Sequence, residues 1–299
     1  MRYLCSILLL CWSQYIYSQE HNFVILNVSG AVAINNGTKN TVAQIGAWLG
    51  GNEHITIPDK ASVTLVCKSE GYVMLSKAGV YHLADYAGKC QQSKTNVMKN
   101  YLKFAWEEFS HHEASTGPDA QEHMQNVGAA VRGHSKCYAI TDASLAMVNY
   151  YQGELQLSWQ KNTTLPLHFK VYEYPDGGNA VMNIAVSTNK YAMSQLTGAL
   201  KKGTDYFWTL VPEGKAEECP RNHLQIWEQA DYNILLKSYK DEVATITTDK
   251  ANEAYMLGYM LEGTHFYAEA LGYYTEAAKL SPANTVYLKA AQTLKARYE

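Results

Sequence analysis

The stretch that most constrains the fold of this chain lies near its carboxyl end, from residue 251 to residue 282. Gly258 and Ala270 are small enough to let two antiparallel helices pack closely against each other. Pro282 has no amide hydrogen to donate and cannot continue a helix, so it marks the end of the second one. The stretch therefore predicts a helical hairpin.

Residues 251–282 also resemble one complete tetratricopeptide repeat. The residues that carry this resemblance are Leu257, Gly258, Tyr267, Ala270, Tyr274, Ala277 and Pro282. Two positions depart from the family pattern, because Ala254 stands where a Trp is usual and Leu261 stands where a Tyr is usual. The resemblance implies a binding or docking scaffold.

A capping helix is expected after the hairpin, since residues 285–298 carry spaced apolar side chains, namely Val286, Leu288, Ala291 and Leu294. Residues 249–299 are therefore predicted to form a helical hairpin with a cap. One repeat and a cap cannot build a solenoid, which generally needs about three units. The unit must pack on the preceding domain, pair with a copy in another chain, or receive a helix from a partner.

The length and composition describe a globular protein of several parts. A chain of 299 residues suits two or three domains. Its content of 47% hydrophobic and 18% charged residues argues against disorder. The net charge of −3 provides no basic field for nucleic acid, so no nucleic-acid partner is expected.

The amino terminus predicts export. Arg2 precedes a short apolar run over residues 7–12, and Ser18 offers a cleavage site, so residues 1–18 are predicted to be a signal peptide. The run is shorter than the roughly 20 residues that span a bilayer, and no transmembrane segment is expected in the mature chain. A buried strand and a lipid-anchored Cys11 are alternatives, but Leu10 does not fit the small residue that precedes a lipidated cysteine. The expected location is periplasmic or extracellular.

Four cysteines follow the predicted signal peptide, at Cys67, Cys90, Cys137 and Cys219. An even number in an exported protein allows two disulfides in three connectivities. We expect Cys67–Cys90 within the first domain and Cys137–Cys219 in the second. No C-x-x-C pair occurs, so neither a zinc knuckle nor a thioredoxin-type site is indicated.

Residues 19–90 read as β structure, with short alternating runs separated by Gly, Pro and Asn turns, which predicts a small β-sandwich or β-roll. Four segments are similar to the FecR-like periplasmic β-domain: Gly30–Ile34, Ile45–Leu49, Glu53–Ile57 and Ala61–Val66. No cytoplasmic segment or transmembrane helix precedes them in the sequence, so the signalling role of that family is not expected here.

Residues 91–135 are expected to hold a helix and a linker. Apolar side chains recur at helical spacing between Ser93 and Glu113, at Val97, Met98, Tyr101, Leu102, Ala105 and Phe109. The following stretch, 115–132, is polar and contains Gly117, Pro118 and Gly128, which is typical of a linker or lid.

Residues 136–240 return to strands, with alternation at 155–159, 167–172 and 202–211. The patterns around Trp159 and Tyr206 resemble a fibronectin type III or related immunoglobulin-like sandwich, in which these two residues would anchor the core. Residues 224–236 fit either a final strand or a helix. The predicted fold class is thus mainly β with α: an N-terminal β-roll or sandwich, a central immunoglobulin-like sandwich, and a C-terminal helical hairpin plus cap.

No stretch of the sequence spells out a reaction. Histidines gather at His111, His112, His123 and His134, but adjacent His111 and His112 point to different helix faces, so solvated polar residues are the simpler reading. Nucleophile elbows and phosphate-binding loops are absent, and carboxylate pairs such as Glu107–Glu108 are sequence neighbours only. We therefore expect no catalytic residue, no cofactor and no metal.

Aromatic side chains give two hypotheses about binding. Several residues of the predicted hairpin occupy positions that packing between its two helices does not require. They are candidates for contacts with a partner segment: Tyr255, Tyr259, His265, Phe266 and Tyr273. Packing of these residues against the central sandwich is the equally weighted alternative. A second set could form a sugar-stacking face instead of a core: Tyr172, Tyr174, Trp208 and Trp227.

The sequence therefore predicts an exported, non-enzymatic scaffold or adaptor of the bacterial cell envelope. Its C-terminal helices would dock a protein partner, and the chain could also pair with a copy of itself. The alternative is a binding module for glycan or cell-wall material that uses the sandwich aromatics. A metal-dependent hydrolase built on the histidines of residues 111–134 is the weakest reading.

Overall fold

The fold is described from a computed structural model, for residues 21–110, 140, 142–160, 164–215, 219–282 and 284–298. Several sequence predictions lie outside these residues. They are the signal peptide over 1–18, the linker over 115–132, Cys137, and the histidines at 111, 112, 123 and 134.

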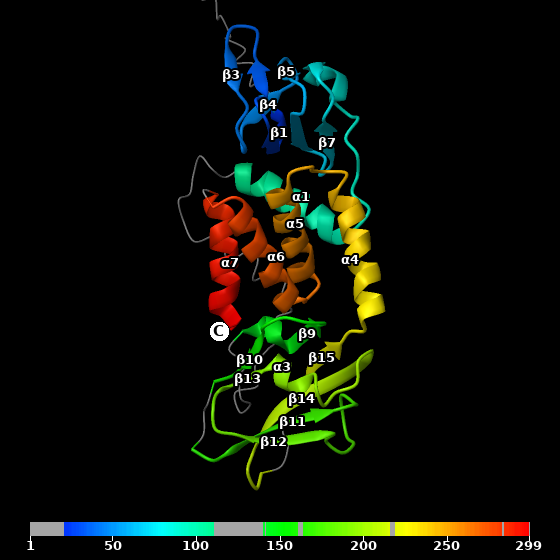
Figure 1. The fold of residues 1–299 in the computed structure, drawn as a ribbon, viewed down its shortest axis with the longest axis vertical. Helices are drawn as coiled ribbons and strands as arrows, with labels where there is room; N and C mark the ends of the chain where they lie inside the picture. Colours follow the sequence, from blue (N-terminus) through cyan, green and yellow to red (C-terminus); the bar gives the residue numbers. More distant parts are fainter. Residues whose placement is uncertain are drawn as a thin grey trace, which may run out of the picture.

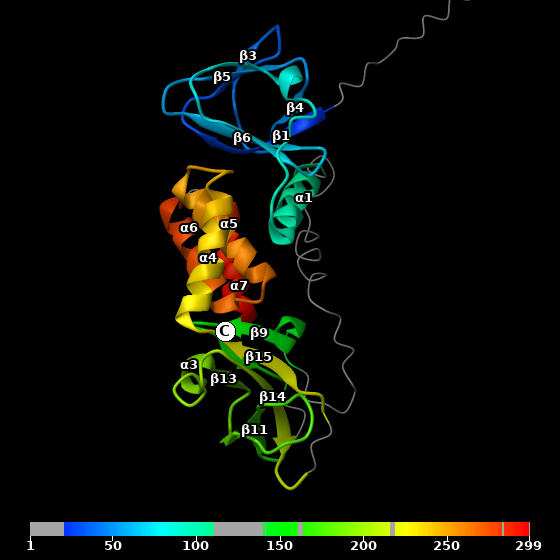
Figure 2. The ribbon, with the colours of Figure 1, turned by 90° about the vertical axis from the view of Figure 1, so that its right-hand side faces the viewer.

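Two β-sandwiches lie at opposite ends of an elongated molecule, and a layer of helices lies between them (Figures 1 and 2). The fold is mainly β with α, which confirms the predicted class. The chain order differs from the spatial order. The C-terminal helices occupy the middle of the molecule, while the central part of the sequence forms one end.

The N-terminal sandwich consists of two four-stranded antiparallel sheets. The first has the order β4-β1-β6-β7, from Trp48–Gly50, His21–Ser29, Ser62–Cys67 and Tyr72–Leu75. The second has the order β3-β2-β5-β8, from Asn40–Val42, Ala33–Asn35, His54–Ile57 and Gly79–His82. Of the two predicted forms, a sandwich or a β-roll, the structure is the sandwich.

Strands β1 and β6 are buried on both faces. Successive side chains on a strand point to opposite sides. Phe23 and Ile25 therefore enter the core between the two sheets, while Val24 and Leu26 face the helices. The six residues of β6 are all buried for the same reason. These strands thus belong both to the sandwich and to the contact with the helical layer.

A short 3₁₀ turn, η1 (Leu83–Tyr86), and helix α1 (Asn96–Ser110) follow the N-terminal sandwich. The predicted helix is confirmed; it begins at Asn96, three residues after the predicted start, and the described part of it ends at Ser110. The Cys67–Cys90 disulfide is also confirmed and ties the end of β6 to the segment that precedes α1. Cys219 takes part in a disulfide as well. Its predicted partner, Cys137, lies outside the described residues, so that pairing stays a prediction.

The second sandwich pairs a five-stranded sheet with a two-stranded one. The larger sheet has the order β12-β11-β14-β15-β9, from Met182–Val186, Leu167–Tyr172, Thr204–Pro212, Asn222–Ile226 and Met147–Tyr150. Its last pair, β15 with β9, is parallel. The smaller sheet joins β10 (Gln156–Ser158) to β13 (Lys190–Ala192). Two short elements complete this part, η2 (Ala143–Ala146) and α3 (Met193–Leu196).

The predicted anchors of this sandwich are buried in its core. Trp159 is fully buried beside Phe169, which also stacks on Trp208. The hydroxyl of Tyr206 on β14 accepts a hydrogen bond from the backbone N–H of Lys201, at 2.9 Å. This bond ties β14 to the turn that precedes it.

Residues 224–236 contain both a strand and a helix, where the sequence had suggested one or the other. Strand β15 ends at Ile226, and helix α4 (Gln229–Val243) starts three residues later, inside the range predicted as sandwich. Tyr232, Tyr239 and Val243 are buried on one side of α4. Their spacing places all three on one face of α4, and this face packs against the rest of the helical layer.

The predicted hairpin is formed by α5 (Lys250–Gly263) and α6 (Tyr267–Leu280), and the predicted cap is α7 (Thr285–Tyr298). A Cβ atom on Gly258 would lie 2.7 Å from the ring of Tyr274, so the close approach of the two helices requires glycine there. Helix α6 ends two residues before Pro282. Within the described ranges, no helix is both long and apolar enough to cross a bilayer.

One hydrophobic core runs through all three layers. It contains Val24 and Val66 of the N-terminal sandwich, Leu102 of α1, Leu257 of α5 and Trp208 of the second sandwich. The helical layer is therefore packed on both sides. The helical hairpin buries its apolar faces within its own chain, by packing on the other parts of the protein.

Candidate functional site at the helical layer

Helix α1 covers the aromatic face of α5 that was predicted to bind a partner. The ring of Tyr259 lies 5.0 Å from that of Tyr101 and 6.0 Å from that of Phe104, both on α1. Tyr255 contacts Tyr101 at 6.4 Å and Tyr287 of α7 at 4.9 Å. These two predicted contact residues are half-buried, and their rings pack against helices of the same chain.

Of the other predicted contact residues, Phe266 and His265 lie next to the second sandwich, whereas Tyr273 lies among the helices. Phe266 is only 1% exposed, and its ring centroid lies 5.0 Å from that of Trp227, which fits the alternative of packing against the central sandwich. His265 is half-buried, and its Nδ1 lies 2.6 Å from the hydroxyl of Tyr267. Burial lowers the pKa of His265, and the nearby His223 lowers it further. Tyr273 is half-buried against the helical core.

Polar side chains of the N-terminal sandwich bind the loop between α4 and α5. The amide of Asn27 donates to the hydroxyl of Thr247 at 2.8 Å, and both groups are buried. Thr64 donates to the carbonyl of Ile246, and the hydroxyls of Tyr72 and Thr245 are hydrogen-bonded. A buried hydrogen bond has directional requirements that apolar packing lacks. This row therefore fixes the orientation of the sandwich on the helices.

Glu242 of α4 caps helix α1. Its carboxylate accepts the backbone N–H groups of Lys94 and Thr95, at 2.7 and 3.1 Å, and the hydroxyl of Thr95 at 2.7 Å. Lys94 and Thr95 directly precede α1, and a negative charge is favoured at that end of a helix. Glu242 is 5% exposed, so this cap also joins α1 to α4 inside the protein.

Glu269 of α6 holds the loop after β9. Its Oε1 accepts the backbone N–H groups of Tyr151 and Gln152, at 2.6 and 2.8 Å. Its Oε2 is buried and has no hydrogen-bond partner within the described part of the chain. Burial raises the pKa of this carboxyl group from 4.5 to about 7, although the two N–H groups act in the opposite direction.

Strand β9 is fastened to the turn between α5 and α6. The backbone N–H of Asn149 donates to the carbonyl of His265 at 3.0 Å, and its side-chain amide donates to the carbonyl of Thr264 at 2.8 Å. The same side chain accepts the indole N–H of Trp227 at 3.2 Å. A single asparagine thus forms hydrogen bonds with groups of both the second sandwich and the helical layer.

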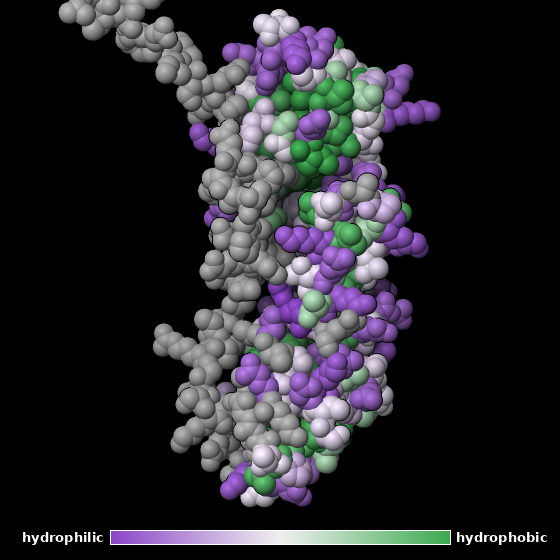
Figure 3. Space-filling model, turned by 90° about the vertical axis from the view of Figure 1, so that its left-hand side faces the viewer, coloured by the Kyte–Doolittle hydropathy of each residue, from purple (hydrophilic) through white to green (hydrophobic). Residues whose placement is uncertain are grey.

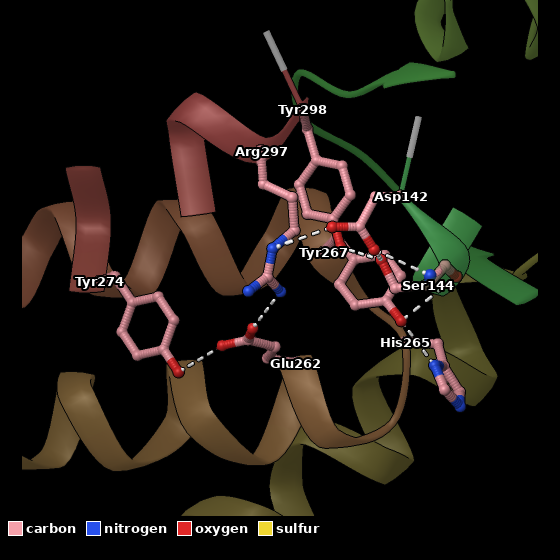
Figure 4. Close-up of polar contacts among 8 residues, drawn as sticks. All are labelled: Asp142, Ser144, Glu262, His265, Tyr267, Tyr274, Arg297 and Tyr298. Carbon is pink, nitrogen blue, oxygen red and sulfur yellow. Dashed lines mark hydrogen bonds and ion pairs between the residues drawn. The ribbon is translucent and has the colours of Figure 1, made fainter. Parts of the chain in front are cut away.

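A charged network joins α5 and α7 to the segment before β9 (Figure 4). Arg297 of α7 lies 3.2 Å from Glu262 of α5 and 3.2 Å from Asp142. The hydroxyl of Tyr274 donates to Glu262 at 2.8 Å. Burial raises the pKa of Glu262, while Tyr274 and Arg297 act to lower it. Breaking such a buried pair on one side is costly, so the network is expected to be a strong structural lock.

The other polar groups of this network bond to one another. The hydroxyl of Ser144 is bonded to Asp142 and Tyr298, each at 2.6 Å, and the imidazole of His265 is bonded to Tyr267 (Figure 4). Within the described ranges, no three His, Cys, Asp or Glu side chains converge on a metal position.

The predicted sugar-stacking aromatics do not share one surface. Trp208 and Tyr172 are buried, and Trp227 packs on Phe266, while Tyr174 is 62% exposed. Arg221 covers the ring of Tyr172 at 3.3 Å. The stacking face that these four residues were predicted to form is therefore absent from the described structure.

The residues that hold the layers together were not identified from the sequence. Glu242, Glu269, Asn149 and Arg297 each bond to groups more than 30 residues away. The sequence offers one weak signal, which is an acidic or polar residue inside an otherwise apolar helical stretch. Comparison with known proteins adds no assignment: no protein-family model matches the sequence, and no curated protein matches it significantly.

Proposed function

We propose that this protein is an exported, non-enzymatic scaffold or adaptor of the cell envelope. The observation that carries the proposal is the continuous core through the helical layer, which packs two sandwiches on opposite sides of one helical unit. Such a body presents two β-surfaces at a fixed separation. The disulfide at Cys67–Cys90 supports an oxidising compartment and hence export.

The helical docking surface that fits this proposal is the outer end of α6 and α7. Phe266 is buried, and the rings of Tyr255 and Tyr259 pack against helices of the same chain, so a surface farther out on the unit is the better candidate. Three large apolar side chains near the α6–α7 turn remain exposed, namely Leu280, Val286 and Leu288. Val286 and Leu288 lie two residues apart on α7 and project to different sides of it, so each is a separate candidate for contact with a protein. A protein partner is expected to cover this end of the unit.

A second surface supports docking at the N-terminal sandwich. Figure 3 shows hydrophobic surface gathered over this sandwich on one side of the molecule. Its large exposed apolar side chains are Val42, Ile45 and Val80. Docking at two separate places is what an adaptor requires.

Site-specific photo-crosslinking in intact cells tests the helical surface. A photoreactive residue at Val286 or Leu288 is expected to capture one envelope protein. Ile234 of α4 is the matched control, because it is an apolar side chain on a helix and is 70% exposed. Identical products from Val286 and Ile234, or no product from any position, would contradict docking through the α6–α7 end.

A further inference from the structure

A row of polar side chains crosses the outer face of one sheet in the N-terminal sandwich. The strand register pairs Asn40 with Asn35, Asn35 with His54, and His54 with His82. Residues directly opposite each other on neighbouring strands project to the same face. Ile34 and Ile55 are buried next to this row, so the row itself points away from the core.

Two imidazoles lie side by side at one end of this row. The ring centroids of His54 and His82 are 4.0 Å apart, and the ring planes make an angle of 62°. His82 is exposed and His54 is half-buried. The Nδ1 atom of His54 is covered and has no hydrogen-bond partner within the described part of the chain. Two neighbouring imidazoles that are partly exposed to solvent, one of which has a nitrogen without a hydrogen bond, are side chains of the kind that bind metal ions.

We propose that His54 and His82 form a two-imidazole site that binds one divalent transition-metal ion, Cu²⁺ more tightly than Ni²⁺ or Zn²⁺. Neutral imidazole is the commonest metal ligand in proteins, and the usual affinity order for nitrogen sites puts Cu²⁺ first. Metal–nitrogen distances of about 2 Å require the two rings to open to roughly 4.5–5 Å between centroids. Small side-chain rotations provide this, because β5 and β8 hold the two backbones in register.

The rest of the row limits the site to two protein ligands. The side-chain amide of Asn35 donates to the oxygen of Asn40 at 2.7 Å, and the oxygen of Asn35 accepts the N–H of Gly37 at 2.7 Å. Both asparagines are thus engaged with each other and with the turn. Water or a small chelator would complete the coordination, so the ion would be exchangeable and would not be needed for folding.

Titration of the full chain with Cu²⁺–iminodiacetate tests the proposal, because this chelate leaves adjacent coordination positions open for two imidazoles. The variants are His54→Gln and His82→Gln. His168→Gln is the matched control, because this histidine lies on a strand of the other sandwich, where its Nδ1 contacts Asn183 instead of a second imidazole. Electron paramagnetic resonance reports the number of coordinated nitrogens, and circular dichroism checks that each variant is folded.

The wild type and His168→Gln are expected to share one binding site with two imidazole nitrogens. Each of the variants His54→Gln and His82→Gln should bind the chelate at that site at least tenfold more weakly. Equal binding by the wild type and His82→Gln would overturn the proposal. Should His54→Gln fail to fold, the exposed His82 alone decides the result.

Discussion

The most unusual single residue of the helical layer is Glu269, a buried carboxylate with one oxygen fully used and the other without a hydrogen-bond partner within the described ranges. Its pKa is raised by burial from 4.5 to about 7, so the folded protein binds this proton more tightly than the unfolded chain does. The contribution of this bound proton to the free energy of unfolding is therefore complete below about pH 4.5. It is lost as the pH rises through 7.

Replacing this carboxyl group by a neutral amide should remove that pH dependence. The variant Glu269→Gln keeps an oxygen for the two N–H groups. We expect its stability relative to the wild type to increase by about 3 kcal/mol between pH 4.5 and pH 8, as a shift of two to three pKa units implies. Urea denaturation at both pH values measures the difference. Glu276→Gln, an exposed change on the same helix, should show no such trend.

A residue-scale property of this kind is invisible in the sequence. Glu269 differs in no local way from the exposed Glu276 of the same helix. Its burial depends on the loop after β9, more than 100 residues earlier. The small residues were more informative, because the steric requirement at Gly258 follows from a local helical pattern and is found in the structure.

At the scale of elements, helix α1 is the part that joins the N-terminal sandwich to the hairpin. It contributes aromatic packing to α5 and receives its cap from Glu242 of α4. Both contacts depend on residues of other helices, far from α1 in the sequence. The helix was predictable from its apolar spacing, whereas its position was not, because spacing reports which face is buried and not what covers it.

Removing the cap should loosen α1 more than the rest of the protein. Glu242→Ala leaves two N–H groups without their acceptor, and we expect a loss of about 2–4 kcal/mol in the free energy of unfolding. Asp241→Ala is the control, because Asp241 is exposed and forms only a surface pair with Lys237. That change should cost less than about 1 kcal/mol. Equal losses in the two variants would show that the cap does not hold α1.

The elements themselves were largely predictable, but helix α4 was not. Its sequence follows strand β15 without a glycine or proline, and its N-cap position, Glu228, makes no side-chain cap hydrogen bond. Of the usual signals for a helix start, α4 has only the acidic Asp231 in its first turn. The strands of both sandwiches were easier to identify, since alternation and turn residues are local.

At the scale of the whole molecule, the helical layer joins two sandwiches into one body. The C-terminal helices return to lie between parts that precede them in the chain, so their contacts are long-range. No local pattern predicts such an arrangement. The sequence left three options for the helical hairpin, and in the structure it packs within its own chain.

Hydrogen exchange measured across a denaturant series tests whether the three layers unfold together, because it reports the opening free energy of each region separately. We predict that amides of β6, α5 and β14 share one opening free energy, equal to that of global unfolding. A lower opening free energy for the N-terminal sandwich alone would contradict it. That result would mean that this sandwich unfolds independently of the helical layer.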